Sequence, residues 1–399
     1  MRVLLTYGWC RTAYVAAESL SRAGWEVYVC DFTGLSMTRF SRFVRGFDFV
    51  PHPFKEPEQY VTELAAIVKR RQIDVLLPVH EDNLPIQTYR DRLPANLIIA
   101  CPSRSDLVKV MDKYEIIKIA ESAKVAVPKT LTPASLSEVD SMARKLGFPL
   151  VIKTRRGNSG KGVFRCDSPE ETVQKYREIV EDFGLANNQM PILQEYIEGS
   201  IYGSCFLAKE GEVKACFTER YLRCKEGGFG TSVFRERCHF PLLEDYAKKM
   251  AKELNWTGIG HFDFVVEPGQ SSAYLIEMNP RFWGAIDLAV KNGFDFPRGL
   301  VTMLSTGEPD AQSFQPVSPS ISSLWIVGET IASVGELRRG QPLAPLASLR
   351  RIFLPGRRCS YDDFRLLDPL PLLVEFAYYG SSFLASGGNI NPVAVEMMQ

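Results

Sequence analysis

The stretch that decides the fold is HFDFVVEPGQSSAYLIEMNPR, residues 261–281. Two apolar segments, 261–267 and 273–279, flank the turn-forming sequence PGQSS, and this pattern predicts a β-hairpin. Successive side chains of a strand point to opposite faces, so Glu277 and Asn279 share one face while Met278 takes the other. If Asp263 points to that same face, two carboxylates and an amide meet there.

This convergence of oxygen-bearing side chains predicts a metal site. Carboxylate and amide oxygens suit Mg²⁺, which completes its shell with water and phosphate oxygens. Burying such groups is unfavourable unless a cation or hydrogen-bond donors accompany them. The competing interpretation is a surface row on an amphipathic hairpin, but the residues around Glu277 are too apolar for that. His261, beside Phe262, is expected to pack against or support this site rather than act as a base.

A second chemical signal is the basic, glycine-rich run KTRRGNSGKGV at residues 153–163. It does not match a P-loop, whose pattern G-x-x-x-x-G-K-[ST] needs a glycine at position 155 and a hydroxyl at position 162. Arg155 and Gly162 occupy those positions. The run still suits phosphate, because glycines let backbone N–H groups approach an anion closely.

The composition describes a globular protein of 399 residues with a substantial core, since 45% of the residues are apolar and 24% are charged. The 47 basic and 47 acidic residues cancel, so the charge gives no indication of nucleic acid or an anionic membrane as partner. Nine scattered cysteines form no CxxC pair, which predicts reduced thiols in a cytoplasmic protein. The N-terminus is too short an apolar run for a signal peptide, and no membrane span is expected.

Residues 1–105 are expected to form a small α/β domain, typical of a doubly wound parallel sheet. The expected elements are strands at 3–7, 25–30 and 73–78, and helices at 12–23 and 57–71. HEDN (80–83) follows the third of these strands, where ligands of open α/β sheets bind. The first turn reads GWCRTA and lacks G-x-G-x-x-G, which disfavours a Rossmann oxidoreductase. A scaffold without chemistry of its own is an equally good interpretation of this domain.

The middle of the chain alternates helices and strands. Helices are expected at 106–123, 135–146, 169–182 and 244–254, and strands at 127–131, 149–153, 162–166, 192–197, 204–209 and 213–221. After about residue 310 a Pro- and Ser-rich link, 313–323, precedes a C-terminal segment. Its basic cluster at 349–358 is interpreted as a solvated surface, and its apolar run at 370–384 as a docked helix rather than a membrane contact.

Four stretches in this order resemble the ATP-grasp superfamily, to which biotin carboxylase, carbamoyl phosphate synthetase and D-alanine–D-alanine ligase belong. The hairpin supplies LIEMNPR (275–281) after GIGHFDF (258–264). DKYEIIKIAESAKVAVPKT (112–130) is similar to the family's entry segment, PLVIKTRRGNSGKGV (149–163) to its phosphate strand and glycine loop, and ILQEYIEGS (192–200) to its adenine hinge. Together they cover about half of the chain, and they are similar to the carbamoyl phosphate synthetase-like, carboxylate–amine ligase subgroup.

The resemblance implies a role for each motif residue. Lys113 and Lys153 bind the nucleotide phosphates, and the glycine loop lies over the triphosphate as a mobile lid. The loop residues with this role are Ser159, Gly160, Lys161 and Gly162, and the adenine is bound by Glu195, Tyr196 and Ile197. Asp263, Glu277 and Asn279 hold the metal, while Arg281 faces the transferred phosphate and acts with Lys153 in catalysis. The cofactors implied are ATP and Mg²⁺, with two ions expected and Mn²⁺ as the alternative metal.

One position departs from the family pattern. Many members carry a glutamate shortly after the hinge glycine to hold the ribose hydroxyls, but here the sequence GSIY (199–202) places Ile201 there. The ribose is therefore expected to be held by Glu198, or the nucleotide binds less tightly.

The implied organisation has three parts: an N-terminal α/β domain at 1–105, an ATP-grasp domain at 106–310 with a lid at about 125–195, and a C-terminal extension at 311–399. The segment ERYLRCKEGGFGTSVF (219–234), with Arg220, Arg223 and Lys225, is either a wall of the acceptor pocket or a plain hairpin loop. The second wall expected for that pocket is HEDN. A homodimer is the assembly to consider first, since it is the commonest one among soluble proteins.

The implied reaction is the joining of a small-molecule carboxylate to an amine through an acyl-phosphate, with release of ADP and phosphate. The alternatives are an enzyme that uses bicarbonate, a kinase that stops at phosphoryl transfer, and a regulator that binds ATP without turnover.

Overall fold

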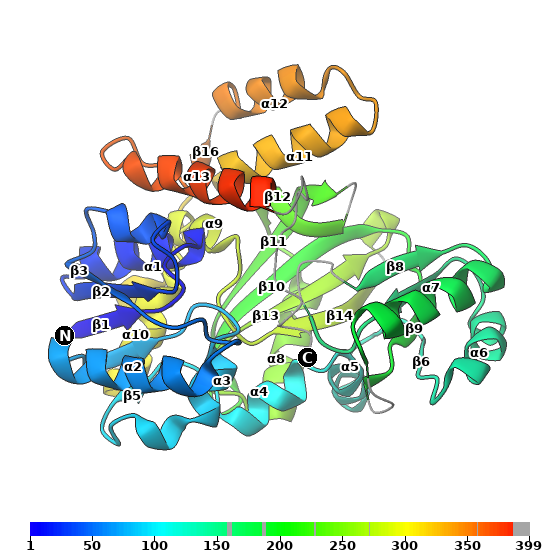
Figure 1. The fold of residues 1–399 in the computed structure, drawn as a ribbon, viewed down its shortest axis with the longest axis horizontal. Helices are drawn as coiled ribbons and strands as arrows, with labels where there is room; N and C mark the ends of the chain where they lie inside the picture. The colour runs from blue at the N-terminus through cyan, green and yellow to red at the C-terminus, as the bar shows by residue number, and fades with distance from the viewer. Residues whose placement is uncertain (158–161, 186–188, 227–228, 271, 357, 386–399) are drawn as a thin grey trace.

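Three β-sheets and the helices around them organise the computed structural model, which makes the fold mixed α/β as predicted (Figure 1). The residues described are 1–157, 162–185, 189–226, 229–270, 272–356 and 358–385. Ser159, Gly160 and Lys161 lie outside them.

The first sheet contains five parallel strands in the order β3-β2-β1-β4-β5. They are β1 (Arg2–Leu5), β2 (Glu26–Asp31), β3 (Gly46–Phe49), β4 (Val75–Leu77) and β5 (Ile98–Ile99). Alternate residues of β1 enter different cores: Val3 and Leu5 lie with α1 (Arg11–Arg22), and Leu4 lies with α2 (Pro57–Arg71). Helices therefore cover both faces, which confirms the doubly wound arrangement. Shorter elements complete this part: η1 (Met37–Phe40), α3 (Asn83–Thr88) and η2 (Arg90–Arg92).

The single helix expected at 106–123 is wrong, because the chain forms two helices there, α4 (Arg104–Val110) and α5 (Lys113–Ser122). Asp112 caps α5, and its Oδ1 accepts hydrogen bonds from the backbone N of Tyr114 (2.9 Å) and Glu115 (3.3 Å). The backbone of Asp112 is extended, so α4 does not continue into α5 as one helix. The break makes Lys113 the first residue of α5.

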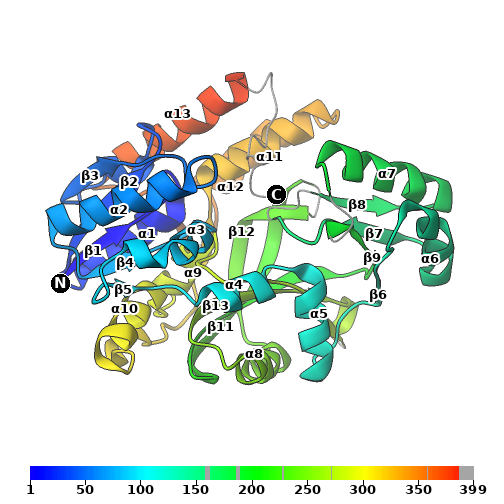
Figure 2. The same ribbon diagram turned by 60° about the horizontal axis from the view of Figure 1, so that its bottom comes forward.

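A four-stranded antiparallel sheet with the order β6-β9-β7-β8 forms a lobe at one end of the molecule (Figures 1 and 2). Its strands are β6 (Thr130–Leu131), β7 (Leu150–Lys153), β8 (Val163–Cys166) and β9 (Ile192–Glu195). The helices packed on it are α6 (Val139–Leu146), which follows η3 (Leu136–Glu138), and α7 (Pro169–Asp182). The predicted bounds of α2 and α7 agree with the structure, since Pro near each start and the apolar periodicity mark both helices.

The central sheet has seven strands in the order β14-β13-β10-β11-β12-β15-β16. They are β10 (Ser200–Lys209), β11 (Glu212–Glu226), β12 (Phe229–Cys238), β13 (Gly258–Val266), β14 (Ala273–Asn279), β15 (Ser322–Leu324) and β16 (Cys359–Tyr361). Both predicted hairpins are confirmed, β10 with β11 and β13 with β14. One face packs on α8 (Pro241–Leu254), and the other shares a core with α9 (Ile286–Lys291), α10 (Phe296–Thr306) and the first sheet. This shared core fixes the central sheet against the N-terminal part.

The C-terminal segment contributes to the central sheet as well as packing on it. The region 313–323, expected as a link, runs from η6 (Ala311–Ser313) into β15, which pairs with β12, and β16 then pairs with β15 in parallel. The helices that follow are α11 (Ile326–Arg338), α12 (Ala344–Phe353) and α13 (Leu370–Ala385). The expected docking of 370–384 is confirmed, because Tyr378 of α13 stacks on Trp9 with ring centroids 4.8 Å apart.

No helix among the described residues is long and apolar enough to cross a membrane. All nine cysteines are free thiols.

A buried ion cluster joins these parts. Asp362, which follows β16, accepts from Arg11 Nε of α1 at 3.2 Å and from Arg235 of β12. Both guanidinium groups also donate to the carbonyl of Gly284, at 2.9 Å and 3.2 Å. Asp362 and Arg235 are fully buried, so each charge depends on the other for compensation.

Replacement of Asp362 by Asn is expected to destabilise the protein strongly, by about 3–5 kcal/mol, because it leaves two buried arginines without their carboxylate. Chemical and thermal unfolding followed by circular dichroism would measure the loss. The control is Asp140→Asn, which removes the exposed partner of Arg144 on α6 and should leave the unfolding midpoint nearly unchanged. Equal midpoints for both variants would contradict the role assigned to the cluster.

Candidate functional site

A cavity of about 740 Å³ lies between the four-stranded lobe and the central sheet. Its lining comes from elements that are far apart in sequence. They include Lys113 of α5, Lys153 of β7, residues 194–201 from the end of β9 to the start of β10, parts of β11–β14, Arg281, residues 283–285 and Glu336 of α11. The four stretches singled out in the sequence therefore meet around one space.

The hairpin of β13 and β14 brings the predicted carboxylates together. Asp263 is the cross-strand partner of Glu277, and both side chains face the cavity. Asn279 Nδ2 lies 3.2 Å from Asp263 Oδ2 and 3.4 Å from Glu277 Oε1. The strand alternation read from the sequence thus gives the correct shared face for Glu277 and Asn279, and the register of the hairpin adds Asp263 to it.

Arg281 is held beside this group by the N-terminal part of the chain. Its Nε donates to Glu81 Oε1 at 2.7 Å, and its Nη2 donates to Asn279 Oδ1 at 3.3 Å. Asn83 Nδ2 donates to the carbonyl of Pro280 at 3.0 Å. Two residues of the HEDN segment therefore contact the hairpin end and fix the guanidinium at the cavity, although HEDN itself is not among the lining residues.

Two lysines add positive charge beside the carboxylates of the site. Lys113 Nζ lies 3.8 Å from Glu277 Oε2 and donates to the carbonyl of Gly157 at 2.7 Å. Lys153 is buried, and burial lowers its pKa to about 8 despite the opposing influence of Glu277. With Arg281, three cations face the carboxylates.

The two carboxyl groups, Asp263 and Glu277, repel each other when both are ionised. Burial and the neighbouring Glu277 raise the pKa of Asp263 well above its ordinary value. Burial would raise the pKa of Glu277 too, but Lys113 and Lys153 lower it below its ordinary value. Two adjacent carboxyl groups that cannot both ionise freely are a donor set that a divalent cation relieves. Asp263, Glu277 and Asn279 all offer oxygen atoms to such a cation. The residues present therefore fit Mg²⁺ or Mn²⁺.

The glycine-rich run joins two antiparallel strands, β7 and β8, and not a strand to a helix. This topology confirms that the run is not a P-loop. Gly157 and Gly162 at its two ends have φ of 115° and 68°, values that favour glycine. The base of the run is closed by Thr154 N, which donates to the carbonyl of Gly162 at 3.0 Å.

The residues expected to bind adenine line the cavity at the end of β9. Glu195, Tyr196, Ile197 and Glu198 are all lining residues, as is Ile201. The carboxylate of Glu195 accepts from the backbone N of Lys129 at 3.3 Å, so it supports the hinge segment locally.

Sequence reasoning missed the aromatic support of the carboxylates. Tyr221 OH donates to Asp263 Oδ1 at 2.8 Å and lies 3.3 Å from His261 Nε2. His261 stacks on Trp283 at 5.7 Å, and its burial lowers its pKa to about 3. It is therefore neutral and packed, as expected. Period-two alternation along β11 could have indicated Tyr221.

The segment 219–234 is a hairpin of β11 and β12, and only part of it reaches the cavity. Arg223 lines the cavity, while Arg220 is exposed on the opposite side, 3.9 Å from Glu236. Lys225 lies over the ring of Trp325. Arg223 Nη1 and Nη2 donate to Glu336 at 2.7 and 2.8 Å, so α11 of the C-terminal segment positions this cation. Nothing in the sequence indicated Glu336.

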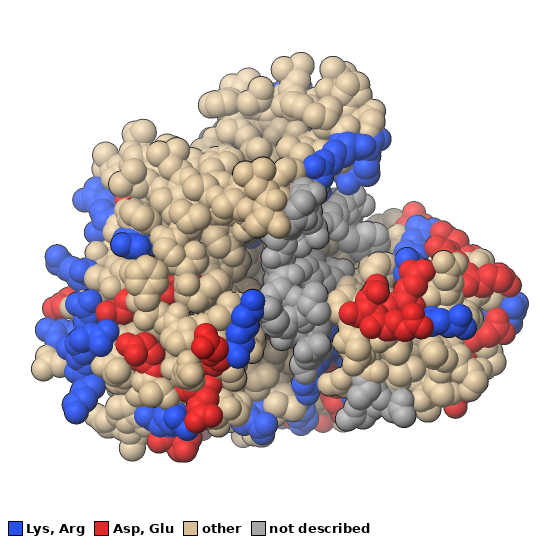
Figure 3. Space-filling model, viewed as in Figure 1, with Lys and Arg blue, Asp and Glu red and all other residues tan. Residues whose placement is uncertain are grey.

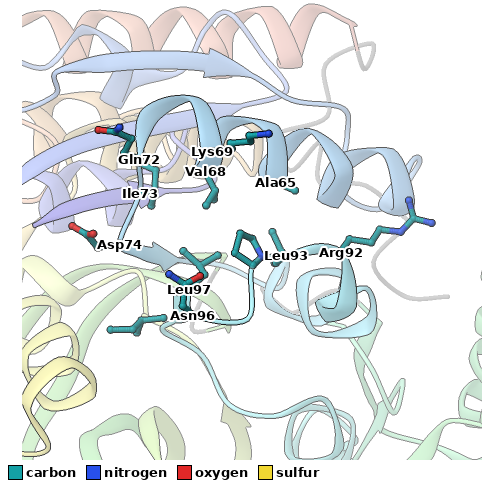
Figure 4. A pocket seen from close by; sticks show the side chains of 12 residues that line it. Ala65, Val68, Lys69, Gln72, Ile73, Asp74, Arg92, Leu93, Asn96 and Leu97 are labelled. Carbon is teal, nitrogen blue, oxygen red and sulfur yellow. The ribbon is translucent and has the colours of Figure 1, made fainter.

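A second hollow, of about 680 Å³, lies on the first sheet between α2 and residues 92–98 (Figure 4). Two of its charged groups have local partners: Asp74 accepts from the backbone N of Arg2 at 2.7 Å, and Arg92 pairs with Glu58. Its lining is otherwise mainly aliphatic, and no set of charged groups converges among its described residues. The chemistry therefore belongs to the larger cavity.

Comparison with known protein families gives a match to the ATP-grasp domain over residues 110–285. Those residues include the cavity's lysines, hinge and carboxylate hairpin.

Residues 110–285 form an ATP-grasp domain.

Among curated relatives, a formate-dependent phosphoribosylglycinamide formyltransferase from Prochlorococcus marinus is 23% identical over 268 residues, covering 65% of this chain and 66% of the relative. A D-alanine–D-alanine ligase from Fusobacterium nucleatum is 24% identical over 184 residues, covering 42% and 55%. A biotin carboxylase from Haemophilus influenzae is 26% identical over 195 residues, covering 44% and 42%. The matches thus span 42–66% of the relatives' own lengths.

Solved structures share the same fold. Biotin carboxylase from Campylobacter jejuni superposes with a TM-score of 0.65 at 15% identity, over 79% of this chain and 73% of that one. An L-amino acid ligase from Bacillus licheniformis superposes with a TM-score of 0.61 at 15% identity, over 79% and 77%.

Binding of MgATP is expected to weaken about tenfold between pH 7 and pH 9, because Lys153 loses its proton around pH 8 in the free protein and phosphate binding favours the charged form. Isothermal titration calorimetry at pH 7, 8 and 9 would measure this. Lys153→Arg stays charged throughout and should show a flat profile. The same decline in the arginine variant would contradict the assignment to Lys153.

Proposed function

We propose that this protein is an ATP-dependent ligase that joins a carboxylate to an amine and releases ADP and phosphate. The observation that supports this most strongly is the Asp263–Glu277 pair, which lines the cavity and is faced by Lys113, Lys153 and Arg281. Phosphoryl transfer needs alignment and charge neutralisation more than covalent help from the protein, and this set supplies both.

In this proposal residues 125–195 act as a lid over nucleotide bound between the lobe and the central sheet. Lys113 and Lys153 bind the phosphates, and residues 195–197 bind the adenine. Asp263, Glu277 and Asn279 hold one or two Mg²⁺ ions, which supply charge neutralisation at the transferred phosphate when bound.

The reaction begins when an oxygen of the substrate carboxylate attacks the γ-phosphorus of ATP and ADP leaves. The amine then attacks the carbonyl carbon of the acyl-phosphate, phosphate leaves, and the amine gives up a proton. Arg281 faces the phosphate through both steps, and its ion pair with Glu81 keeps it oriented. The closed lid excludes water, which would otherwise hydrolyse the acyl-phosphate.

The acceptor pocket is assigned to the part of the cavity farthest from the hinge, between residues 281–285 and the β11–β12 hairpin. Thr231 and Ser232 line it with hydroxyl groups, and Arg223 lines it as part of an ion pair with Glu336.

The first test is a screen for ADP and phosphate release with MgATP over a matrix of amino acids and small carboxylates. Release is expected to require one carboxylate and one amine, and to fall at least ~100-fold in Glu277→Gln, since loss of a metal-binding carboxylate removes several kcal/mol of stabilisation.

The matched control is Glu267→Gln, which changes a carboxylate of the same hairpin outside the cavity and should retain activity. Release with a carboxylate alone and a stable phosphorylated product would favour a kinase, and release with bicarbonate would favour a carboxylase. Tight ATP binding without release across the matrix would favour a regulator.

Glu198 is proposed to hold the ribose in place of the family's usual glutamate, since the side chain of Ile201 accepts no hydrogen bond. The protein should then bind ATP roughly 10–100-fold more tightly than 2′-deoxy-ATP, and Glu198→Ala should abolish this preference. Binding titrations with both nucleotides would measure it. An unchanged ratio in the variant would remove Glu198 from the ribose site.

A further inference from the structure

Asp263 is hydrogen-bonded to a side chain outside the proposed set of metal ligands. The hydroxyl of Tyr221, which lines the cavity from β11, donates to Asp263 Oδ1 at 2.8 Å. Asp263 Oδ2 instead accepts from Asn279 Nδ2 at 3.2 Å, and Asn279 belongs to the same set of oxygen donors as Asp263. One oxygen of Asp263 is therefore held by a residue of another strand, while the other lies among the groups assigned to the metal.

The neighbouring His261 determines where the hydroxyl proton of Tyr221 points. The imidazole presents Nδ1 to Asn279 Nδ2 at 3.5 Å and Nε2 to the Tyr221 hydroxyl at 3.3 Å. An amide nitrogen only donates, so Nδ1 accepts and the neutral imidazole carries its proton on Nε2. Nε2 then donates to the Tyr221 oxygen, which leaves the hydroxyl proton for Asp263. Glu219 Oε1, at 3.8 Å from Nε2, is too far away to accept that N–H.

The strand between these residues leaves room for the contact. β10 lies between β11 and β13, and its Gly203 pairs with Glu219 on one side and with Asp263 on the other. A Cβ at Gly203 would lie 2.7 Å from His261 Nε2 and 2.9 Å from Glu219 Cγ, closer than a Cβ atom can come. Glycine at this position thus allows His261 to reach over β10 toward the Tyr221 hydroxyl.

We propose that Tyr221 makes the site select Mg²⁺ over Ca²⁺, an inference that rests on the assignment of Asp263 to the metal in the proposed function. With Oδ1 occupied by the hydroxyl, Asp263 has one oxygen to offer a cation. Mg²⁺ needs a compact octahedral shell, which single carboxylate oxygens, water and phosphate can complete. Ca²⁺ is larger, takes more oxygen ligands and often binds both oxygens of a carboxylate. The hydrogen bond therefore withholds an oxygen that Ca²⁺ would use.

Charge cannot make this distinction, because the two ions carry the same charge and are attracted by the same carboxylates. On the face of the molecule in Figure 3, acidic and basic side chains are interspersed over both the N-terminal part and the lobe. The choice between the ions therefore depends on how many oxygens the site offers, and Tyr221 controls one of them.

The test compares the dissociation constants of the magnesium and calcium complexes of ADP, measured by isothermal titration calorimetry with each metal in excess over the nucleotide. The wild type is expected to bind MgADP roughly tenfold more tightly than CaADP. Tyr221→Phe keeps the ring and removes only the hydroxyl. The preference for magnesium should then fall roughly fivefold or more, the size expected for the loss of one charge-assisted hydrogen bond.

Tyr274→Phe is the matched control, because it removes a hydroxyl from β14 of the same hairpin, outside the lining of the cavity, and should leave the preference unchanged. Binding of ADP in the presence of EDTA should be equal in the wild type and both variants. An unchanged preference in Tyr221→Phe overturns the proposal. So does an equal weakening of ADP, MgADP and CaADP in that variant, because such a result gives Tyr221 a structural role only.

The same measurement separates this inference from the ligase activity, since it needs no product. Selective binding of MgADP that is lost in Tyr221→Phe, without amide formation from any tested pair, would support the inference and contradict the ligase. A wild type that binds MgADP and CaADP equally, or whose affinity for ADP responds to neither metal, would overturn the inference whatever the product screen shows.

Discussion

The structure is organised around two carboxyl groups that the register of one hairpin forces side by side. Asp263 and Glu277 are cross-strand partners in a buried sheet, and neighbouring carboxylates in such a place need positive charge. That charge comes from three separate parts of the chain: Lys113 begins a helix, Lys153 ends a strand of the lobe, and Arg281 is held by Glu81 of the N-terminal sheet. The electrostatic demand of one hairpin thus helps to explain why the three sheets meet at one cavity.

Much of this could be predicted from the sequence because its signals are local. Strand alternation depends only on neighbouring residues, so the shared face of Glu277 and Asn279 follows directly from the pattern. Helices such as α2 and α7, with proline at the start and a clear apolar stripe, were predicted with their bounds. The ATP-grasp resemblance added the order of the motifs, and the match over residues 110–285 confirmed it.

The features that could not be predicted depend on contacts between residues far apart in the sequence, or on which of two local structures a few neighbouring residues form. The helix breaks before Lys113 because the side chain of Asp112 accepts hydrogen bonds from backbone N–H groups in the first turn of α5. The apolar periodicity of residues 106–123 continues across this break, so it predicted a single helix. Glu336 reaches Arg223 across 113 residues, and no spacing rule connects them. The strand β15 lies in a Pro- and Ser-rich stretch whose composition indicated a link. It is a strand because it pairs with the edge of β12, a contact that composition does not reveal.

The ion cluster at Asp362 has a consequence for how the chain folds during its synthesis. Arg235 belongs to the middle of the central sheet, but its carboxylate partner is made 127 residues later. At a typical translation rate of ~5–20 residues per second, roughly 6–25 seconds pass before that partner exists. During this interval Arg235 lacks the carboxylate that accepts its hydrogen bond, and the buried Glu219 of β11 is the neighbouring carboxylate already made. The central sheet is also completed late, because its strands β15 (Ser322–Leu324) and β16 (Cys359–Tyr361) are made after the other five.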